Sequence, residues 1–139
     1  MPEMQGRLLA LDLGTKRVGA AVCDELRLTT RPLPPLARTN WKKLLVEVAA
    51  LVEEFAAVGL VLGLPLNLDG TAGAAAEEAR RLARNFELSL KIPVYLQDER
   101  LTSRDAEETL GINARSNAAR RSQIDSLAAA IILRDFLAQ

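Results

Sequence analysis

The chain of 139 residues suits one compact domain, and 49% of its residues are hydrophobic, enough to bury a real core. Acidic and basic residues balance to a formal net charge of zero, so attraction to a polyanion must come from a local basic patch. Histidine is absent and cysteine occurs once, at Cys23, which excludes Ser-His-Asp and Cys-His triads, internal disulfides and zinc sites built from Cys clusters. No apolar run reaches a membrane-spanning length, and the first residues lack a signal-peptide pattern. We therefore expect a cytoplasmic protein with no membrane partner.

The first part of the chain predicts three strands joined by short turns. Leu8–Leu13 is an almost continuous apolar run, typical of a strand that is buried on both faces. Val18–Cys23 is a second strand of small residues after the turn Gly14–Arg17. Arg27–Leu33 is a third strand, expected to end at the prolines Pro32, Pro34 and Pro35. Strands connected in this way form an antiparallel meander.

The rest of the chain predicts alternating helices and strands. Thr39-Asn40 is a good N-cap pair before an amphipathic helix whose apolar residues recur from Trp41 to Phe55. The later elements are the strand Leu60–Leu64, the helix Ala72–Leu90, the strand Ile92–Leu96 and the helices Thr102–Leu110 and Ser122–Leu137. The order β-β-β-α-β-α-β-α-α predicts an α/β fold with a mixed five-stranded sheet and helices on both faces.

Three acidic residues lie where core packing would favour apolar ones. Asp12 ends the first strand, Glu99 follows the last strand next to Asp98, and Asp125 opens the final helix. Each also has a structural explanation. Asp12 could pair with Lys16 or Arg17 or cap a turn, Glu99 could be a surface acid, and Asp125 could complete a capping box with Ser122. Asp125 nevertheless heads a helical stripe that is otherwise apolar, through Ala129, Ile132 and Phe136.

The positions of these acids favour a metal centre over three unrelated structural roles. Strand ends in an α/β fold are the usual place for functional sites. Carboxylates brought close together repel each other unless a cation lies between them. Because histidine is absent, that cation should be hard and oxygen-ligated, Mg²⁺ or Mn²⁺. Two such ions about 4 Å apart could activate a water and stabilise the leaving oxygen in phosphodiester hydrolysis.

Four segments resemble, in order, the motifs of the YqgF (RuvX-like) family: DLGTKRVG from Asp12, GLPLNLDGT from Gly63, DERLTS from Asp98 and IDSLAAAIIL from Ile124. The resemblance extends from about Leu8 to Leu137. It implies a ribonuclease H-like fold, with residues 1–139 forming a single nuclease domain. The implied activity is that of a metal-dependent nuclease, acting either in pre-16S rRNA processing or as a Holliday junction resolvase.

The resemblance also implies roles for individual residues. Asp12, Glu99 and Asp125 match the acidic triad of the family, which makes them the expected catalytic residues and metal ligands. Residues expected to bind the substrate are Arg17, Asn67, Arg100, Arg120 and Arg121. Asp69-Gly70 is primarily a turn. The family often has a lysine before the last acid of the triad, where this chain has Ile124.

Two other classes of protein remain as alternatives. An ATPase of the actin and sugar-kinase type also begins with an apolar strand followed by Asp, Gly and Thr, but its two lobes need a longer chain, and no Walker A pattern is present. A nucleic-acid-binding module without catalysis would keep the same fold. Aromatic residues make up only 4% of the chain, so recognition through base stacking is unfavourable. The partner could be pre-rRNA or branched DNA, and symmetric cleavage of a junction would require a homodimer.

Overall fold

The computed structural model describes residues 5–14, 16–67, 69–99 and 118–139, and the side chains of residues 118–125 lie outside this description. Along the chain the elements are β1 (Leu8–Leu13), β2 (Arg17–Cys23), β3 (Thr30–Ala37), α1 (Trp41–Phe55), β4 (Gly59–Leu64), α2 (Ala74–Leu90), β5 (Val94–Asp98) and α4 (Ala118–Leu137). The predicted helix Thr102–Leu110 falls outside the described residues. No helix in the described part of the chain is long and apolar enough to cross a membrane.

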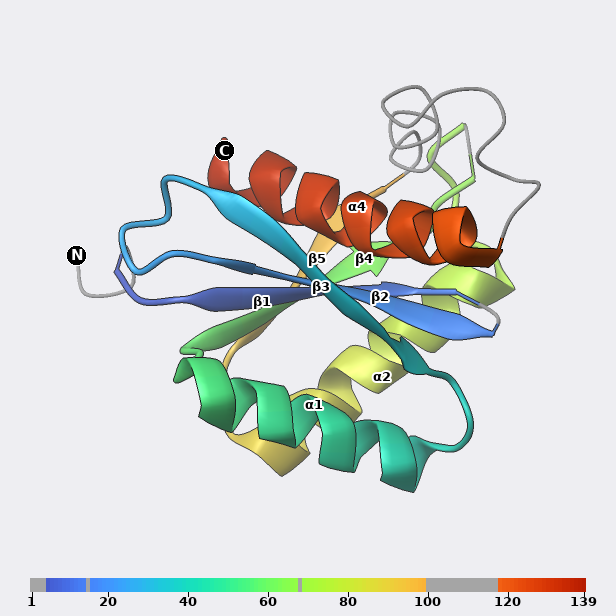
Figure 1. Cartoon of the computed structure of the whole chain (residues 1–139). Helices are drawn as coiled ribbons and strands as arrows, with labels where there is room; N and C mark the ends of the chain where they lie inside the picture. The colour runs from blue at the N-terminus through green and yellow to red at the C-terminus, as the bar shows by residue number, and fades with distance from the viewer. Residues whose placement is uncertain (1–4, 15, 68, 100–117) are drawn as a thin grey trace.

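The strands form one mixed sheet with the order β3-β2-β1-β4-β5 (Figure 1). Strands β1, β2 and β3 pair antiparallel, which confirms the predicted meander. Strand β4 pairs parallel with β1 and with β5. The carboxyl ends of β1, β4 and β5 therefore lie at the same edge of the sheet.

Alternation along β1 divides the core between the two faces of this sheet. Leu9 and Leu11 pack with the apolar residues of α1 and α2, whereas Leu8 and Ala10 pack against Ile132 and its neighbours on α4. Figure 1 shows α4 on one face and α1 and α2 on the other. Helices cover both faces of β1, so its residues are apolar at consecutive positions. The predicted helices on both faces are confirmed.

The third strand continues through the prolines that were expected to end it. Strand β3 is Thr30–Ala37 rather than Arg27–Leu33. It is an edge strand of the sheet. A proline, which has no N–H, therefore removes no hydrogen bond to a further strand here. Its register with β2 also shifts, since Ala20 pairs with Leu33 but Val18 pairs with Leu36, and this bulge accommodates Pro34 and Pro35.

Helix α2 begins at Ala74 rather than Ala72, and β2 and β4 each begin one residue earlier than predicted. Two other differences in boundaries bear on the site. Strand β5 is Val94–Asp98, two residues later than expected, so it reaches the acidic segment. Helix α4 begins at Ala118, so Asp125 lies inside it rather than opening it, and Ser122 is not its N-cap. The segment Ala118–Arg121 contains strong helix formers and joins the helix instead of the preceding loop. The cap of α1 is as predicted, with the Asn40 side chain accepting a hydrogen bond from Lys43 N at 2.8 Å.

Candidate active site

Asp12 and Glu99 lie on the face of the sheet that α4 covers. Asp12 follows Leu8 and Ala10 in the alternation of β1, and both of these pack against α4. On β5, Tyr95 lies on the same face, because its ring contacts the Phe136 ring of α4 with a centroid separation of 5.1 Å. Glu99 follows in the same alternation. The two predicted acids therefore come from different strands to the same side of the sheet.

The strand between them carries a glycine where the two side chains approach. Strand β4 lies between β1 and β5 and ends with Gly63 and Leu64. A Cβ added to Gly63 would lie 2.7 Å from the carboxyl carbon of Glu99 and 2.8 Å from Ile132 Cδ1. The Glu99 carboxyl therefore occupies the space that any other residue at position 63 would fill. Sequence reasoning did not single out Gly63, although a glycine inside the apolar run Leu60–Leu64 is a known sign of a close approach.

The Glu99 carboxyl is held in its neutral form by its surroundings. Burial, and then the negative charge of Asp12, raise the pKa of Glu99 to about 9, and a hydrogen bond to Asp12 and the charge of Asp98 act in the same direction. Near neutral pH the protonated Glu99 carboxyl thus donates to the Asp12 carboxylate. The structure thus brings the Glu99 carboxyl to Asp12, and this carboxyl was not among the partners that the sequence suggested for Asp12. A cation could replace the shared proton.

The turn after β1 is tight and well bonded. Gly14 N donates to the carbonyl oxygens of Asp12, at 3.1 Å, and of Arg17, at 3.0 Å. A Cβ on Gly14 would lie 2.7 Å from the Arg17 carbonyl oxygen, so this position has no room for a side chain. Arg38, which follows β3, donates from Nη1 to the carbonyl oxygen of Gly14 at 2.7 Å.

The loop after β4 is held by its own side chains. The Asn67 side-chain amide donates to Thr71 Oγ1 at 2.9 Å, and Thr71 donates from N and Oγ1 to Asp69 Oδ1 at 2.9 and 2.7 Å. Gly70 has a φ of +89° and its N–H donates to the Asn67 carbonyl oxygen, which confirms the predicted turn. Asn67 therefore has a local structural role, and the residue as a whole is exposed.

Helix α4 brings the backbone of the third predicted acid to the same face. Asp125 lies in α4 one turn before Ala129, which is buried against Ala21 of β2. The next residue, Ser126, is 4% exposed and donates from Oγ to the Leu33 carbonyl oxygen of β3 at 2.6 Å. This buried bond anchors the helix beside residue 125. The Asp125 side chain lies outside the described residues, and within the described residues no three acidic or cysteine side chains gather as a metal site.

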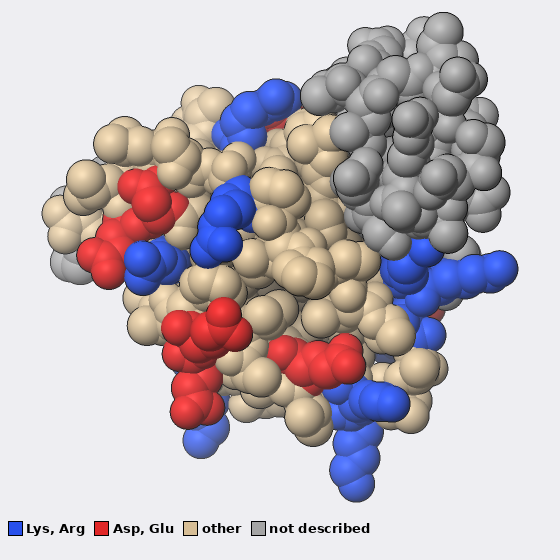
Figure 2. All heavy atoms as spheres, in the orientation of Figure 1, with Lys and Arg blue, Asp and Glu red and all other residues tan. Residues whose placement is uncertain are grey.

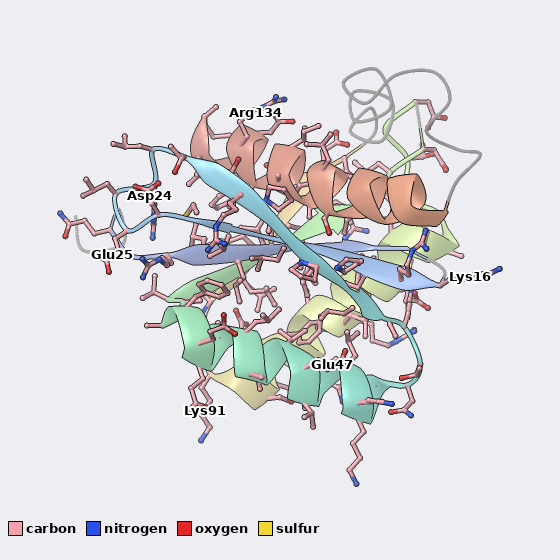
Figure 3. The ribbon with its side chains drawn as sticks, viewed as in Figure 1. Lys16, Asp24, Glu25, Glu47, Lys91 and Arg134 are labelled. Carbon is pink, nitrogen blue, oxygen red and sulfur yellow. The ribbon has the colours of Figure 1, made fainter. Side chains whose placement is uncertain are left out.

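The structure describes only some of the residues that are expected to bind substrate. Arg17 begins β2, where it pairs with Ala37, and its side chain is half-buried. Arg120 and Arg121 belong to the first turn of α4, and Arg100 lies outside the described residues. Lys16 points into solvent at the turn between β1 and β2 (Figure 3). In the same view, Lys and Arg side chains gather at this end of the molecule (Figure 2).

The donors present fit a hard divalent cation. Asp12 and Glu99 offer only carboxylate oxygens, which are the ligands preferred by Mg²⁺ and Mn²⁺. Their approach across Gly63 leaves two half-buried carboxyls sharing one proton, an arrangement that a cation would stabilise. Asp12 and Glu99 are therefore the residues of the described chain that could hold such an ion.

Comparison with known proteins identifies the family. The model of the family described as "RuvX: Holliday junction resolvase" matches residues 6–139. The chain belongs to the RuvX family. A relative from Syntrophus aciditrophicus (strain SB), named "Putative pre-16S rRNA nuclease", is 43% identical over 94% of this chain and 87% of its own length. A relative of the same name from Rhodopseudomonas palustris (strain BisB5) is 44% identical over 96% of this chain and 83% of its own length. This RuvX-family chain is thus a nuclease, a hydrolase acting on phosphodiester bonds, as its motifs predicted.

Solved structures confirm the predicted fold. RuvC from Thermus thermophilus in complex with a Holliday junction substrate has a TM-score of 0.57 with 17% identity, covering 95% of this RuvX-family chain and 94% of that chain. Thermus thermophilus RuvC is also matched in a second structure, with a TM-score of 0.56 and 14% identity, over 95% of both chains. The ribonuclease H-like α/β fold predicted from the sequence is therefore confirmed, and divalent-metal dependence is a general property of this nuclease fold.

Proposed function

We propose that this chain, acting as one domain in the cytoplasm, hydrolyses a phosphodiester bond of structured RNA in the 5′-end processing of pre-16S rRNA. The observation that carries the proposal is the Asp12–Glu99 pair, held across Gly63 at the carboxyl ends of β1 and β5. The relatives that match nearly the whole chain carry the name of this activity. Asp125, from α4, is the third proposed carboxylate of the site.

We assign Asp12, Glu99 and Asp125 as the ligands of Mg²⁺ or Mn²⁺ and as the catalytic residues. Two bound ions would supply an activated water and charge stabilisation at the leaving oxygen. Glu99 must lose its proton before it can bind a cation as an anionic ligand. The affinity of the site for the metal should therefore increase as pH rises toward 9. Ile132 Cδ1 and the Glu99 carboxyl both lie close to the position that a Cβ on Gly63 would occupy, so Ile132 would shield the inner side of the pair from water.

The substrate backbone is proposed to bind at the same end of the molecule. Arg17 leads out of the turn that follows Asp12, and Arg120 and Arg121 lie in the first turn of α4. Arg100 directly follows Glu99 in the sequence, and Asn67 lies in the exposed loop after β4. Their cationic or amide groups suit phosphate oxygens, which is the contact that dominates affinity for nucleic acid.

Resolution of Holliday junctions is the second candidate, because the matching family is described by that activity. The active-site chemistry would be the same for either nucleic acid. A resolvase, however, makes two symmetric cuts, so this candidate requires the chain to act as a homodimer. A processing nuclease could act as a monomer.

A cleavage assay at physiological salt separates these candidates. Wild-type protein and Asp12→Asn are compared with Mn²⁺ or Mg²⁺ on a pre-16S rRNA 5′ precursor and on a four-way DNA junction. Asp135→Asn is the matched control, since Asp135 pairs with Arg134 at 3.1 Å on the outer part of α4. We expect the RNA to be cut by wild type and control only. Preferential cutting of the junction by a dimer would favour the second candidate, and binding without any cutting would indicate a non-catalytic module.

A further inference from the structure

Arg38 connects three parts of the structure at the end where Asp12 lies. Its backbone N–H donates to the Lys16 carbonyl oxygen at 3.0 Å, and its Nη1 donates to the Gly14 carbonyl oxygen at 2.7 Å. Its Nη2 forms an ion pair with the Glu78 carboxylate of α2. The side chain is 24% exposed, so these bonds are partly shielded from water. A single residue thus joins the turn between β1 and β2, the end of β3 and the start of α2.

The bond to Gly14 restrains the backbone next to Asp12. Gly14 N already donates to the Asp12 carbonyl oxygen, and Arg38 holds the carbonyl of the same glycine from the other side. A Cβ on Gly14 would lie 2.7 Å from the Arg17 carbonyl oxygen, so the two ends of this turn approach each other closely. Because Asp12 is the last but one residue of β1, the position of its carboxylate depends on where this turn sits. A displaced turn would change the distance from Asp12 to Glu99.

Glu78 orients the Arg38 side chain. A guanidinium presents several N–H groups in one rigid plane, so Nη2 can bind a carboxylate while Nη1 binds a carbonyl. Lysine has a flexible stem and a compact charge, and it cannot hold both partners in this fixed geometry. The neighbouring pair on α2, Arg80 with Glu77 at 3.2 Å, lies on the same helix and has no bond of this kind to the turn in the described structure.

We propose that Arg38, oriented by Glu78, is a positioning residue that holds Gly14 and Lys16 after β1 and thereby places the Asp12 carboxylate for metal binding. The inference rests on the proposed function of the Asp12–Glu99 site. Outer partners that orient metal ligands typically contribute 10- to 100-fold to metal affinity or activity when they are removed. Arg38 does not touch the reacting atoms, so its effect is expected on metal binding and turnover.

The test compares Arg38→Ala, Arg38→Lys and Glu78→Gln with wild type, and uses Arg80→Ala as the matched control. Mn²⁺ affinity is measured by calorimetry without nucleic acid, kcat and KM are measured on the cleaved substrate, and thermal unfolding is followed for each protein. We expect Arg38→Ala to weaken Mn²⁺ binding about tenfold or more, with a similar loss in kcat and little change in KM. Arg38→Lys and Glu78→Gln should lie between Arg38→Ala and wild type, and Arg80→Ala should match wild type.

Two results would overturn the positioning role of Arg38 alone, and a third would overturn the proposed function as well. Wild-type Mn²⁺ affinity and kcat in folded Arg38→Ala would show that Arg38 only stabilises the fold. The same conclusion would follow if Arg80→Ala lost as much Mn²⁺ affinity as Arg38→Ala, because the effect would not be specific to the turn. Absence of Mn²⁺ binding and cleavage in wild type itself would instead refute the proposed function, and the positioning role with it.

Discussion

Replacing Glu99 by Gln should make the metal-free protein more stable at alkaline pH. In the folded protein, burial and the Asp12 carboxylate raise the pKa of Glu99 from its ordinary value of 4.5 to about 9. Between these two values the unfolded chain releases the Glu99 proton and the folded protein keeps it. The folded state binds more protons, so the free energy of unfolding falls as pH rises through this window. Glutamine is neutral at every pH and keeps a similar size.

The size of the effect follows from the slope of this linkage. Inside this window, each rise of one pH unit lowers the free energy of unfolding by about 1.4 kcal/mol because of the Glu99 carboxyl. From pH 6 to pH 8, wild type should therefore lose about 2–3 kcal/mol more than Glu99→Gln. For a domain of this size, that difference corresponds to roughly 5–15 °C in melting temperature.

The assay is urea unfolding of both proteins at several pH values, with a chelator present. Glu54→Gln is the control, because Glu54 is an exposed glutamate on α1, away from the site. It should follow the wild-type pH dependence. Saturating Mn²⁺ should raise wild-type stability, and more so at higher pH, because the ion replaces the proton. If the free energies of unfolding of wild type and Glu99→Gln changed in parallel with pH, this account of the Asp12–Glu99 pair would be refuted.

Three other predictions test the surroundings of the site. Gly63→Ala places a methyl group against the Glu99 carboxyl and Ile132, so it should weaken Mn²⁺ binding and cost about 1–3 kcal/mol of stability, measured by calorimetry and urea unfolding. Ser126→Ala leaves the buried Leu33 carbonyl without its 2.6 Å partner and should cost about 1–2 kcal/mol in urea unfolding, whereas Ser126→Thr would keep the hydroxyl. Replacing both Arg120 and Arg121 by Ala should weaken RNA binding and lower its dependence on salt concentration, as measured by titration at several ionic strengths, and an unchanged slope would contradict their role at the backbone.

Local patterns were sufficient where the relevant interactions are local. The continuous apolar run Leu8–Leu13 coincides with β1, and Asn40 caps α1 as its sequence context predicted. Periodicity and turn residues act over a few positions, so they are readable without the fold. The same signals failed at β3, because whether Pro34 and Pro35 interrupt a strand depends on the strand's place in the sheet.

The sequence by itself indicated the order of the elements that the structure describes, the mixed sheet and the family, and it pointed to Asp12, Glu99 and Asp125 as acids of one metal site. Only the tertiary structure decided that Asp12 and Glu99 meet across Gly63, with Glu99 neutral beside the Asp12 carboxylate. It also showed that Arg38, from the end of β3, holds the turn that follows Asp12. The physical reason is that burial and proximity between residues far apart in the chain set these energies, and neither is visible in a short stretch of sequence.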